Sequence, residues 1–144
     1  HALRGLPLFR CATPMRLIAH RGNVWGPCPE RENTVDYIRE ALAAGFEVEV
    51  DVWDLGDDGR LWLGHDAPAH AVDAAFLLTP GLWCHAKNLR ALEALLALGA
   101  HCFAHDADAH AVTSQGFLWA YPGREIDSPH AEAVLPERAA PEPP

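Results

Sequence analysis

The segment GFEVEVDVW, residues 45–53, decides the fold because its apolar and acidic side chains alternate strictly. Successive side chains of a strand point to opposite faces, so the pattern predicts a strand with one hydrophobic face and one acidic face. The acidic face carries Glu47, Glu49 and Asp51. Carboxylates about 7 Å apart repel one another, and a hard divalent ion held by Glu49 and Asp51 would relieve that repulsion. The alternative is a solvated edge strand that uses charge against aggregation.

Strand and helix patterns alternate on both sides of this segment. Further strands are predicted at residues 16–20, 61–66, 82–87, 101–106, 117–121 and 133–135, and helices at about 33–44 and 88–99. This alternation is typical of an α/β protein with a largely parallel sheet. Polar residues follow the carboxyl ends of several of these strands, and in a TIM-like (β/α) barrel those ends meet at one face. We therefore predict such a barrel. It must be reduced, with several outer helices missing or shortened, because a complete barrel takes about 200 residues or more and the chain has 144.

Composition limits the classes of partner. The net charge of -9 argues against a nucleic-acid partner, because phosphate backbones attract basic surfaces. No apolar run approaches the roughly 20 residues that span a bilayer, and the four cysteines show no zinc-type spacing. We expect a cytoplasmic protein with reduced thiols and one domain over residues 15–137. Residues 1–14 precede the only methionine and are expected to be a tag or an extension, and residues 138–144 a disordered tail.

Four short motifs carry the chemistry: His20-Arg21-Gly22, Glu32-Asn33-Thr34, Glu49-Val50-Asp51 and His65-Asp66. In this order and spacing they resemble the glycerophosphodiester phosphodiesterase family, within the wider superfamily of phosphatidylinositol-phospholipase-C-like phosphodiesterases. The resemblance covers about residues 16–66. It implies metal-assisted hydrolysis of a small-molecule phosphodiester by two histidines.

The resemblance also implies a role for each motif. His20 and His65 would be the acid–base pair, Arg21 would hold phosphate oxygens, and Glu49 and Asp51 would hold Mg²⁺ or Ca²⁺. Glu32 would lie at the rim and add a ligand, while Asn33 and Thr34 would fix the start of the helix. These roles suit the chemistry, because an imidazole titrates near neutrality and a guanidinium forks onto phosphate. Taken singly, His20 is equally consistent with a hydrogen-bonded core histidine, His65 with a turn residue and Arg21 with a surface ion pair.

The sequence departs from the family at His85-Ala86-Lys87. The family places a metal-binding Glu and, two residues later, a Lys on this strand, so Lys87 fits a phosphate-binding role and His85 replaces the carboxylate. An uncharged imidazole would weaken binding of Mg²⁺ or Ca²⁺, which remain the expected ions. The alternatives are that it favours Mn²⁺ or Zn²⁺, or that it leaves the site short of one ligand. Glu47 has no counterpart in the motifs and is expected to be structural, paired with Arg16 or Lys87.

Other polar and aromatic residues follow later strands. His105, Asp106 and Asp108 could replace the lost carboxylate, although a turn with local hydrogen bonds explains them equally well. Trp119 could line a substrate pocket, and core packing is the alternative. A barrel with missing helices would leave surface to be covered, so a homodimer is also expected.

The sequence thus predicts a phosphoric diester hydrolase. Two alternatives remain open: a phosphodiesterase acting on another phosphorylated substrate, such as a lipid or polymer, and an inactive descendant that binds a phosphorylated ligand. The leaving alcohol is not evident, because the resemblance is poor over residues 67–130.

Overall fold

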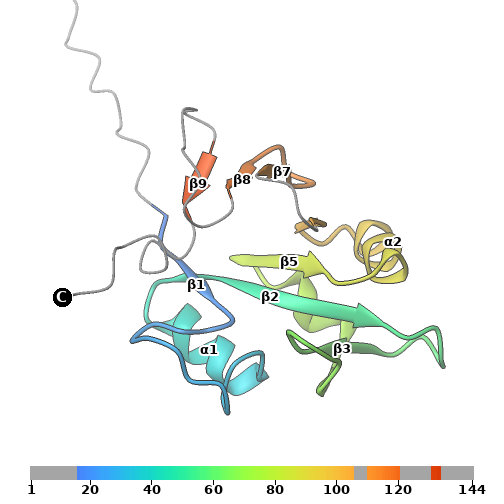
Figure 1. The fold of residues 1–144 in the computed structure, drawn as a ribbon, viewed down its shortest axis with the longest axis horizontal. Helices are drawn as coiled ribbons and strands as arrows, with labels where there is room; N and C mark the ends of the chain where they lie inside the picture. Colours follow the sequence, from blue (N-terminus) through green and yellow to red (C-terminus); the bar gives the residue numbers. More distant parts are fainter. Residues whose placement is uncertain (1–15, 106–109, 121–130, 134–144) are drawn as a thin grey trace, which may run out of the picture.

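The computed structural model describes residues 16–105, 110–120 and 131–133, which form an open mixed sheet, two α-helices and a smaller sheet (Figure 1). The main sheet has six strands: β1 (Ile18–His20), β2 (Glu47–Asp54), β3 (Leu61–Leu63), β4 (His70–Val72), β5 (Leu82–Ala86) and β6 (Cys102–Phe103). Their order is β4-β3-β2-β5-β6, and β1 also pairs with β2. The pairs of β2 with β1 and β5 are parallel, whereas its pair with β3 is antiparallel.

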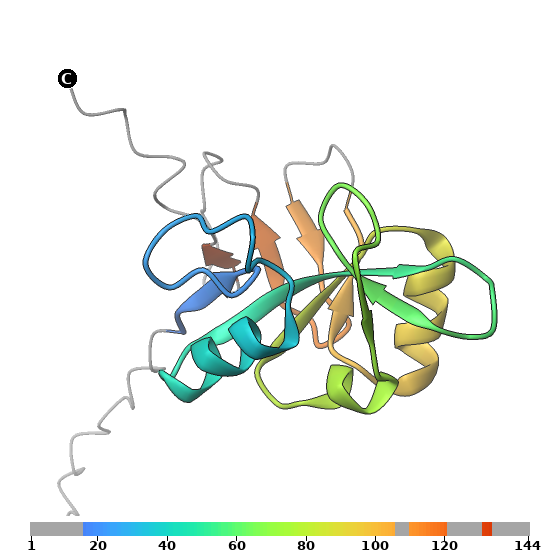
Figure 2. The same ribbon diagram turned by 90° about the horizontal axis from the view of Figure 1, so that it is seen from below.

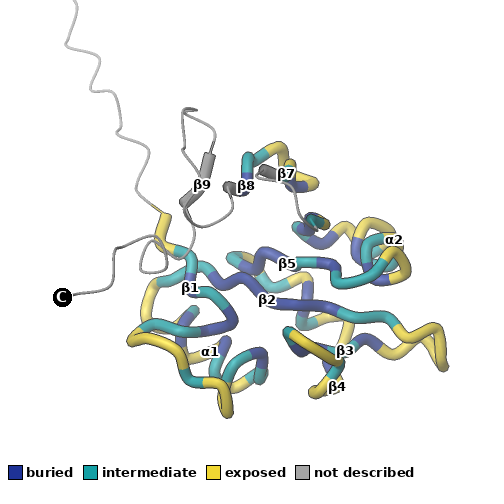
Figure 3. The backbone as a smooth tube through the Cα atoms, in the orientation of Figure 1, coloured by how far each residue is buried: buried dark blue, intermediate teal, exposed yellow. Residues whose placement is uncertain are grey.

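Strand β2 is the centre of the sheet, and Figure 3 shows it buried along most of its length. The strand has the two faces that the sequence predicts, and Val48, Val50 and Val52 are fully buried on one of them. Glu49 and Asp51 point to the other face, which we call the inner face. Because β5 is in register with β2, His85 lies beside Asp51 and Trp83 beside Glu49.

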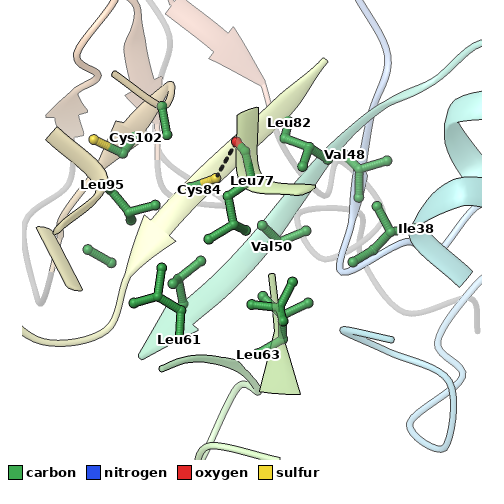
Figure 4. Packing of buried hydrophobic residues seen from close by; sticks show 14 of the residues in the cluster. Ile38, Val48, Val50, Leu61, Leu63, Leu77, Leu82, Cys84, Leu95 and Cys102 are labelled. Atoms are coloured by element: carbon green, nitrogen blue, oxygen red, sulfur yellow. Dashed lines mark hydrogen bonds between the residues drawn. The ribbon is translucent and has the colours of Figure 1, made fainter. Parts of the chain in front are cut away.

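The helices cover the valine face. Helix α1 (Val35–Ala43) begins after Thr34, whose hydroxyl accepts a hydrogen bond from the Tyr37 N–H. Helix α2 (Leu89–Leu98) begins after Asn88, which caps the Ala91 N–H in the same way. Both helices contribute to one hydrophobic core, in which Ile38 of α1 and Leu95 of α2 join the valines of β2 and the cysteines of β5 and β6 (Figure 4). The Cys84 thiol also lies 3.9 Å from the main-chain oxygen of Leu77.

An aromatic cluster lies on the inner face. Trp83 and Phe103 pack there against Trp119 of β8, and the Phe103 and Trp119 ring centroids are 4.4 Å apart. Strand β8 (Leu118–Ala120) is the middle strand of the smaller sheet, between β7 (His110–Val112) and β9 (Ala131–Ala133). The predicted substrate-lining role of Trp119 therefore gives way to the alternative of core packing.

The predicted barrel is wrong: among the described strands the main sheet is open, and it is mixed rather than parallel. The physical reason is that β1 and β3 share one edge of β2, pairing with residues 47–49 and 52–54 respectively. The sheet then turns back through the antiparallel pair β3–β4 instead of continuing through parallel strands. At the other end, β6 has only two residues, and β7 pairs with β8 instead of extending the sheet.

The segment between β3 and β5 has secondary structure of its own. It contains β4 and a 3-10 helix, η1 (Ala74–Leu78), whose Leu77 is buried in the core. Within the described residues, no helix is long and apolar enough to cross a bilayer. The predicted extension, residues 1–14, and tail, residues 138–144, lie outside the described part of the chain.

Candidate metal centre

Three side chains on the inner face form a group that can hold a metal ion: Glu49, Asp51 and His85. One ligand atom from each lies within 4.8 Å of the others. His85 Nδ1 is 3.2 Å from an Asp51 carboxylate oxygen and 3.6 Å from a Glu49 oxygen. Such spacing suits donors that surround one ion at about 2.0–2.2 Å each. Both carboxylates are almost fully buried, at 1% exposure each, and burying two anions together is costly without a cation.

Glu49 has a further feature that suits a cation. Its Oε2 atom is buried and accepts no hydrogen bond from the described residues. His20 Nε2 lies 3.4 Å from it, which is an ion-pair distance without hydrogen-bonding geometry. Burial, together with the negative charge of Asp51, raises the pKa of Glu49 to about 7. A metal ion would reverse this effect and keep the carboxylate ionised.

His85 is fixed by contacts on both sides of its ring. The ring stacks on Phe103, with centroids 4.9 Å apart and planes 4° from parallel. Nδ1 faces the carboxylates, while Nε2 lies 3.3 Å from the main-chain oxygen of His105. An N–H at Nε2 that donates to this carbonyl would leave the Nδ1 lone pair for a metal ion, which is the usual arrangement of a histidine ligand. The donor set therefore fits a divalent ion.

Without a metal, His85 is the counter-charge of the carboxylates. Burial alone would lower its pKa, but hydrogen bonds to Asp51 and Glu49 raise the pKa to about 9. Burial likewise opposes ionisation of Asp51, yet hydrogen bonds from His85 and Asn33 hold the pKa of Asp51 well below its ordinary value. Metal binding at His85 must therefore displace a proton.

Two predicted catalytic histidines reach this centre from different segments, one from the end of a strand and one from a loop. His20 ends β1, and its parallel register places it directly beside Glu49. His65 follows β3, and its Nδ1 lies 3.3 Å from Asp51 Oδ2. Burial lowers the pKa of His65, outweighing the attraction of Asp51, and the positive charges of Arg21 and Lys87 lower it further. Figure 2 shows the loop after β1 and the loop after β3 rising on the same side of the sheet.

Two cations flank the carboxylates. Arg21 is 8% exposed, with Nε 3.5 Å from Asp51 and Nη1 3.2 Å from Glu32. Lys87 Nζ lies 3.9 Å from Asp51 Oδ1. Both can also reach an anion, since each has donors in excess of these contacts.

Glu32 lies next to Arg21 and Asn23. It accepts hydrogen bonds from Arg21 and from Asn23 Nδ2, the latter at 2.8 Å. Burial would raise the pKa of Glu32, but these two bonds lower it below its ordinary value. The structure thus gives Glu32 the task of orienting Arg21, and it is not part of the group formed by Glu49, Asp51 and His85.

Sequence reasoning missed the role of Asn33. Thr34 caps α1 as expected, whereas Asn33 is buried and binds Asp51 through two hydrogen bonds. A usable signal was present, because an asparagine beside a helix start often takes the left-handed conformation, and Asn33 has a φ of 58°.

The remaining candidates are placed as follows. His105 contributes its main-chain oxygen, and its ring stacks near His85 with centroids 5.8 Å apart. Asp106 and Asp108 lie outside the described residues. Glu47 pairs with Arg16 at 3.7 Å, which is one of the two structural partners expected for it.

Comparisons of the chain with protein-family models, curated proteins and solved structures found no match. A fold alone does not imply a function. Any functional proposal therefore depends on the geometry of this site.

Proposed function

We propose that the chain hydrolyses a phosphodiester with the help of a divalent metal ion, as the resemblance of its motifs to glycerophosphodiester phosphodiesterases suggests. One observation carries the proposal: two histidines from separate segments of the chain flank the same buried carboxylate pair, His20 at Glu49 and His65 at Asp51. Hydrolysis of a phosphodiester needs charge neutralisation and a proton transfer on each side of phosphorus. This centre offers both.

Each polar residue of the centre has its own role in the proposed hydrolysis. Arg21 and Lys87 bind phosphate oxygens. His65, whose lowered pKa favours the neutral imidazole near pH 7, takes a proton from the attacking hydroxyl group or water. His20 gives a proton to the departing alkoxide. Glu49, Asp51 and His85 would hold the divalent ion, which would supply Lewis-acid polarisation of the phosphoryl oxygen.

The ligand set favours a particular class of ion. Mg²⁺ and Ca²⁺ prefer oxygen ligands, whereas imidazole suits Mn²⁺ and Zn²⁺. Because His85 is held in place by Phe103 and the His105 carbonyl, the site offers one nitrogen and two carboxylates. We therefore favour Mn²⁺ or Zn²⁺ over Mg²⁺ or Ca²⁺.

The experiment is an assay of the chelated protein on bis(p-nitrophenyl) phosphate after addition of each of these four ions. His20→Ala should lower kcat by about 10²–10⁴-fold. His70→Ala, which changes an exposed histidine of β4, is the matched control and should leave kcat unchanged. Equal turnover by His20→Ala and the wild type would mean a contaminant or a wrong site.

A second candidate function is favoured by His85. When no metal is bound, the raised pKa of His85 favours its protonated form, which pairs with Asp51 and contacts Glu49. The metal-free centre therefore contains a positive charge of its own. Such a centre could bind a phosphorylated ligand without turning it over. Binding of a phosphonate in the absence of turnover with any of the four ions would favour this second function.

A further inference from the structure

A cavity of about 450 Å³ lies beside the metal centre. It is formed by the carboxyl ends of β5 and β6 and the first turn of α2, and His85 and Lys87 are part of its wall. These two side chains also contact Asp51, at 3.2 and 3.9 Å. Two residues of its wall thus also touch the metal centre, so the cavity is adjacent to the place where the phosphate of a substrate would lie.

The wall of the cavity combines polar and apolar side chains. His85 and Lys87 are its residues that touch the metal centre, whereas Leu89, Leu92 and Ala104 supply apolar surface from α2 and the end of β6. Leu89 is 69% exposed, so this apolar surface is open to a ligand. A molecule that fits would carry its negative charge near Lys87 and place an apolar group against the leucines.

We propose that this cavity binds one of the two alcohols of the phosphodiester, and that this alcohol is partly apolar and larger than glycerol. The inference rests on the proposed function for the position of the phosphate. Small-molecule sites usually have volumes of about 300–1,000 Å³ and mainly apolar walls, and this cavity lies within that range. Glycerol would leave most of the volume to water and the leucines without a partner. A bare glycerol ester is therefore the weaker choice.

The test compares two non-hydrolysable probes, phenylphosphonate and methylphosphonate, by calorimetric titration of the Mn²⁺-loaded and the chelated protein. Both probes carry the phosphonate charge, and they differ only in the group that would enter the cavity. Burial of a phenyl ring should make phenylphosphonate bind about tenfold tighter or better, equivalent to ~1.4 kcal/mol. Equal affinity for the two probes, or binding of neither, would overturn the inference.

Two variants fill the cavity from opposite walls, Leu92→Trp from α2 and Ala104→Trp from the end of β6. Each should bring the two affinities within about twofold of each other. Leu96→Trp is the matched control, because Leu96 lies one turn further along α2, is exposed and does not line the cavity. Ala104 is an exposed residue, so Ala104→Trp keeps the test valid if Leu92→Trp fails to fold. A preference for phenylphosphonate that survives in Ala104→Trp would place the ring elsewhere.

The two proposals fail in different ways. If the protein hydrolyses bis(p-nitrophenyl) phosphate but shows no preference between the probes, the cavity assignment is wrong and the proposed function stands. If it prefers phenylphosphonate through the cavity but never hydrolyses a diester, the proposed function is wrong and the cavity remains a binding site.

Discussion

Asn33 binds Asp51 through both the nitrogen and the oxygen of its side-chain amide. Its Nδ2 donates to Asp51 Oδ2, and its Oδ1 accepts from the Asp51 backbone N–H, each at 3.0 Å. The two residues are 18 positions apart, and both are 1% exposed. The loop before α1 is thereby joined to the centre of β2, and one carboxylate oxygen is fixed in a single direction.

Asn33→Gly should weaken Mn²⁺ binding by about 10–100-fold, because it removes an outer contact that orients a metal ligand. Glycine is the suitable replacement, since it tolerates the left-handed backbone at this position. Calorimetric titration with Mn²⁺ provides the affinity. Thr34→Ala is the control: it should cost about 1 kcal/mol of stability through loss of the helix cap and leave the affinity for Mn²⁺ unchanged. Equal affinity in Asn33→Gly and the wild type would contradict the positioning role.

His85→Glu should change the metal preference. A third carboxylate replaces the imidazole, so the ratio of Mg²⁺ to Mn²⁺ affinity should rise by about tenfold or more, which is ~1.4 kcal/mol. The metal-free variant should also unfold at a lower temperature, because three buried carboxylates repel one another. Competition titrations and thermal unfolding measure the two effects. His70→Glu adds the same charge on an exposed strand and should alter neither.

The stability of the metal-free protein should fall as the pH rises from 6.5 to about 9. The pKa of His85 is raised from 6.5 to about 9 on folding, so the folded state binds this proton more tightly, and the stability it contributes is lost across that window. Glu49, with its pKa raised from 4.5 to about 7, contributes in the same direction at lower pH. Urea unfolding in chelator across this range measures the effect. His85→Gln should remove most of the pH dependence between 6.5 and about 9, and an unchanged slope in that variant would refute the assignment.

The rate of phosphodiester hydrolysis should fall at low pH. The pKa that governs this fall, the acid limb of the pH profile, should lie below 6.5, the ordinary value for histidine. His65 must be neutral to accept a proton, and its pKa is lowered by burial and by the charges of Arg21 and Lys87. Lys87→Met should therefore move the acid limb to higher pH, apart from any loss of phosphate binding. Arg90→Met removes a charge from the exposed face of α2 and should leave the limb in place. A limb that stays fixed in Lys87→Met would exclude His65 as the base.

Gly64→Ala should damage both stability and turnover. A Cβ at Gly64 would collide with the main-chain oxygen of Ala67, so the backbone next to His65 must move. We expect a loss of about 1–3 kcal/mol from overpacking and a fall in kcat of up to about 10²-fold from displacement of His65. Gly59→Ala in the β2–β3 turn has open space around its Cβ and should affect stability alone. Thermal unfolding and the diesterase assay separate the two effects.

Local patterns in the sequence predicted β2 and both α-helices, but they did not predict β4, η1 or β7. The alternation in β2 gave its two faces, and both α-helices lie within the predicted ranges 33–44 and 88–99. Closure into a barrel could not be predicted in this way, because it depends on which edges pair. Periodicity contains no information on the sharing of one edge of β2 by β1 and β3.

In the candidate site, too, the sequence predicted the residues at strand ends but not the contacts that loops make with them. Residues at strand ends, such as His20 and His85, were identifiable because parallel register brings such positions together. The contact of Asn33 with Asp51 arises from a loop that folds over the sheet, and spacing alone did not reveal it. The shortage of a third carboxylate was visible in the sequence, whereas the support of His85 by Phe103 and the His105 carbonyl was not.

Because β2 has one apolar face and one charged face, its register relative to β5 determines which side chains enter the site. A shift of β2 by one residue relative to β5 would exchange its faces, putting Val50 among the charged groups and Asp51 into the helix-covered core. The packing of Val48, Val50 and Val52 therefore also determines the aim of Glu49 and Asp51. Mutations in the core that packs against the valine face of β2 lie far from any reacting atom. They should nevertheless lower catalytic activity as strongly as mutations of the ligands themselves.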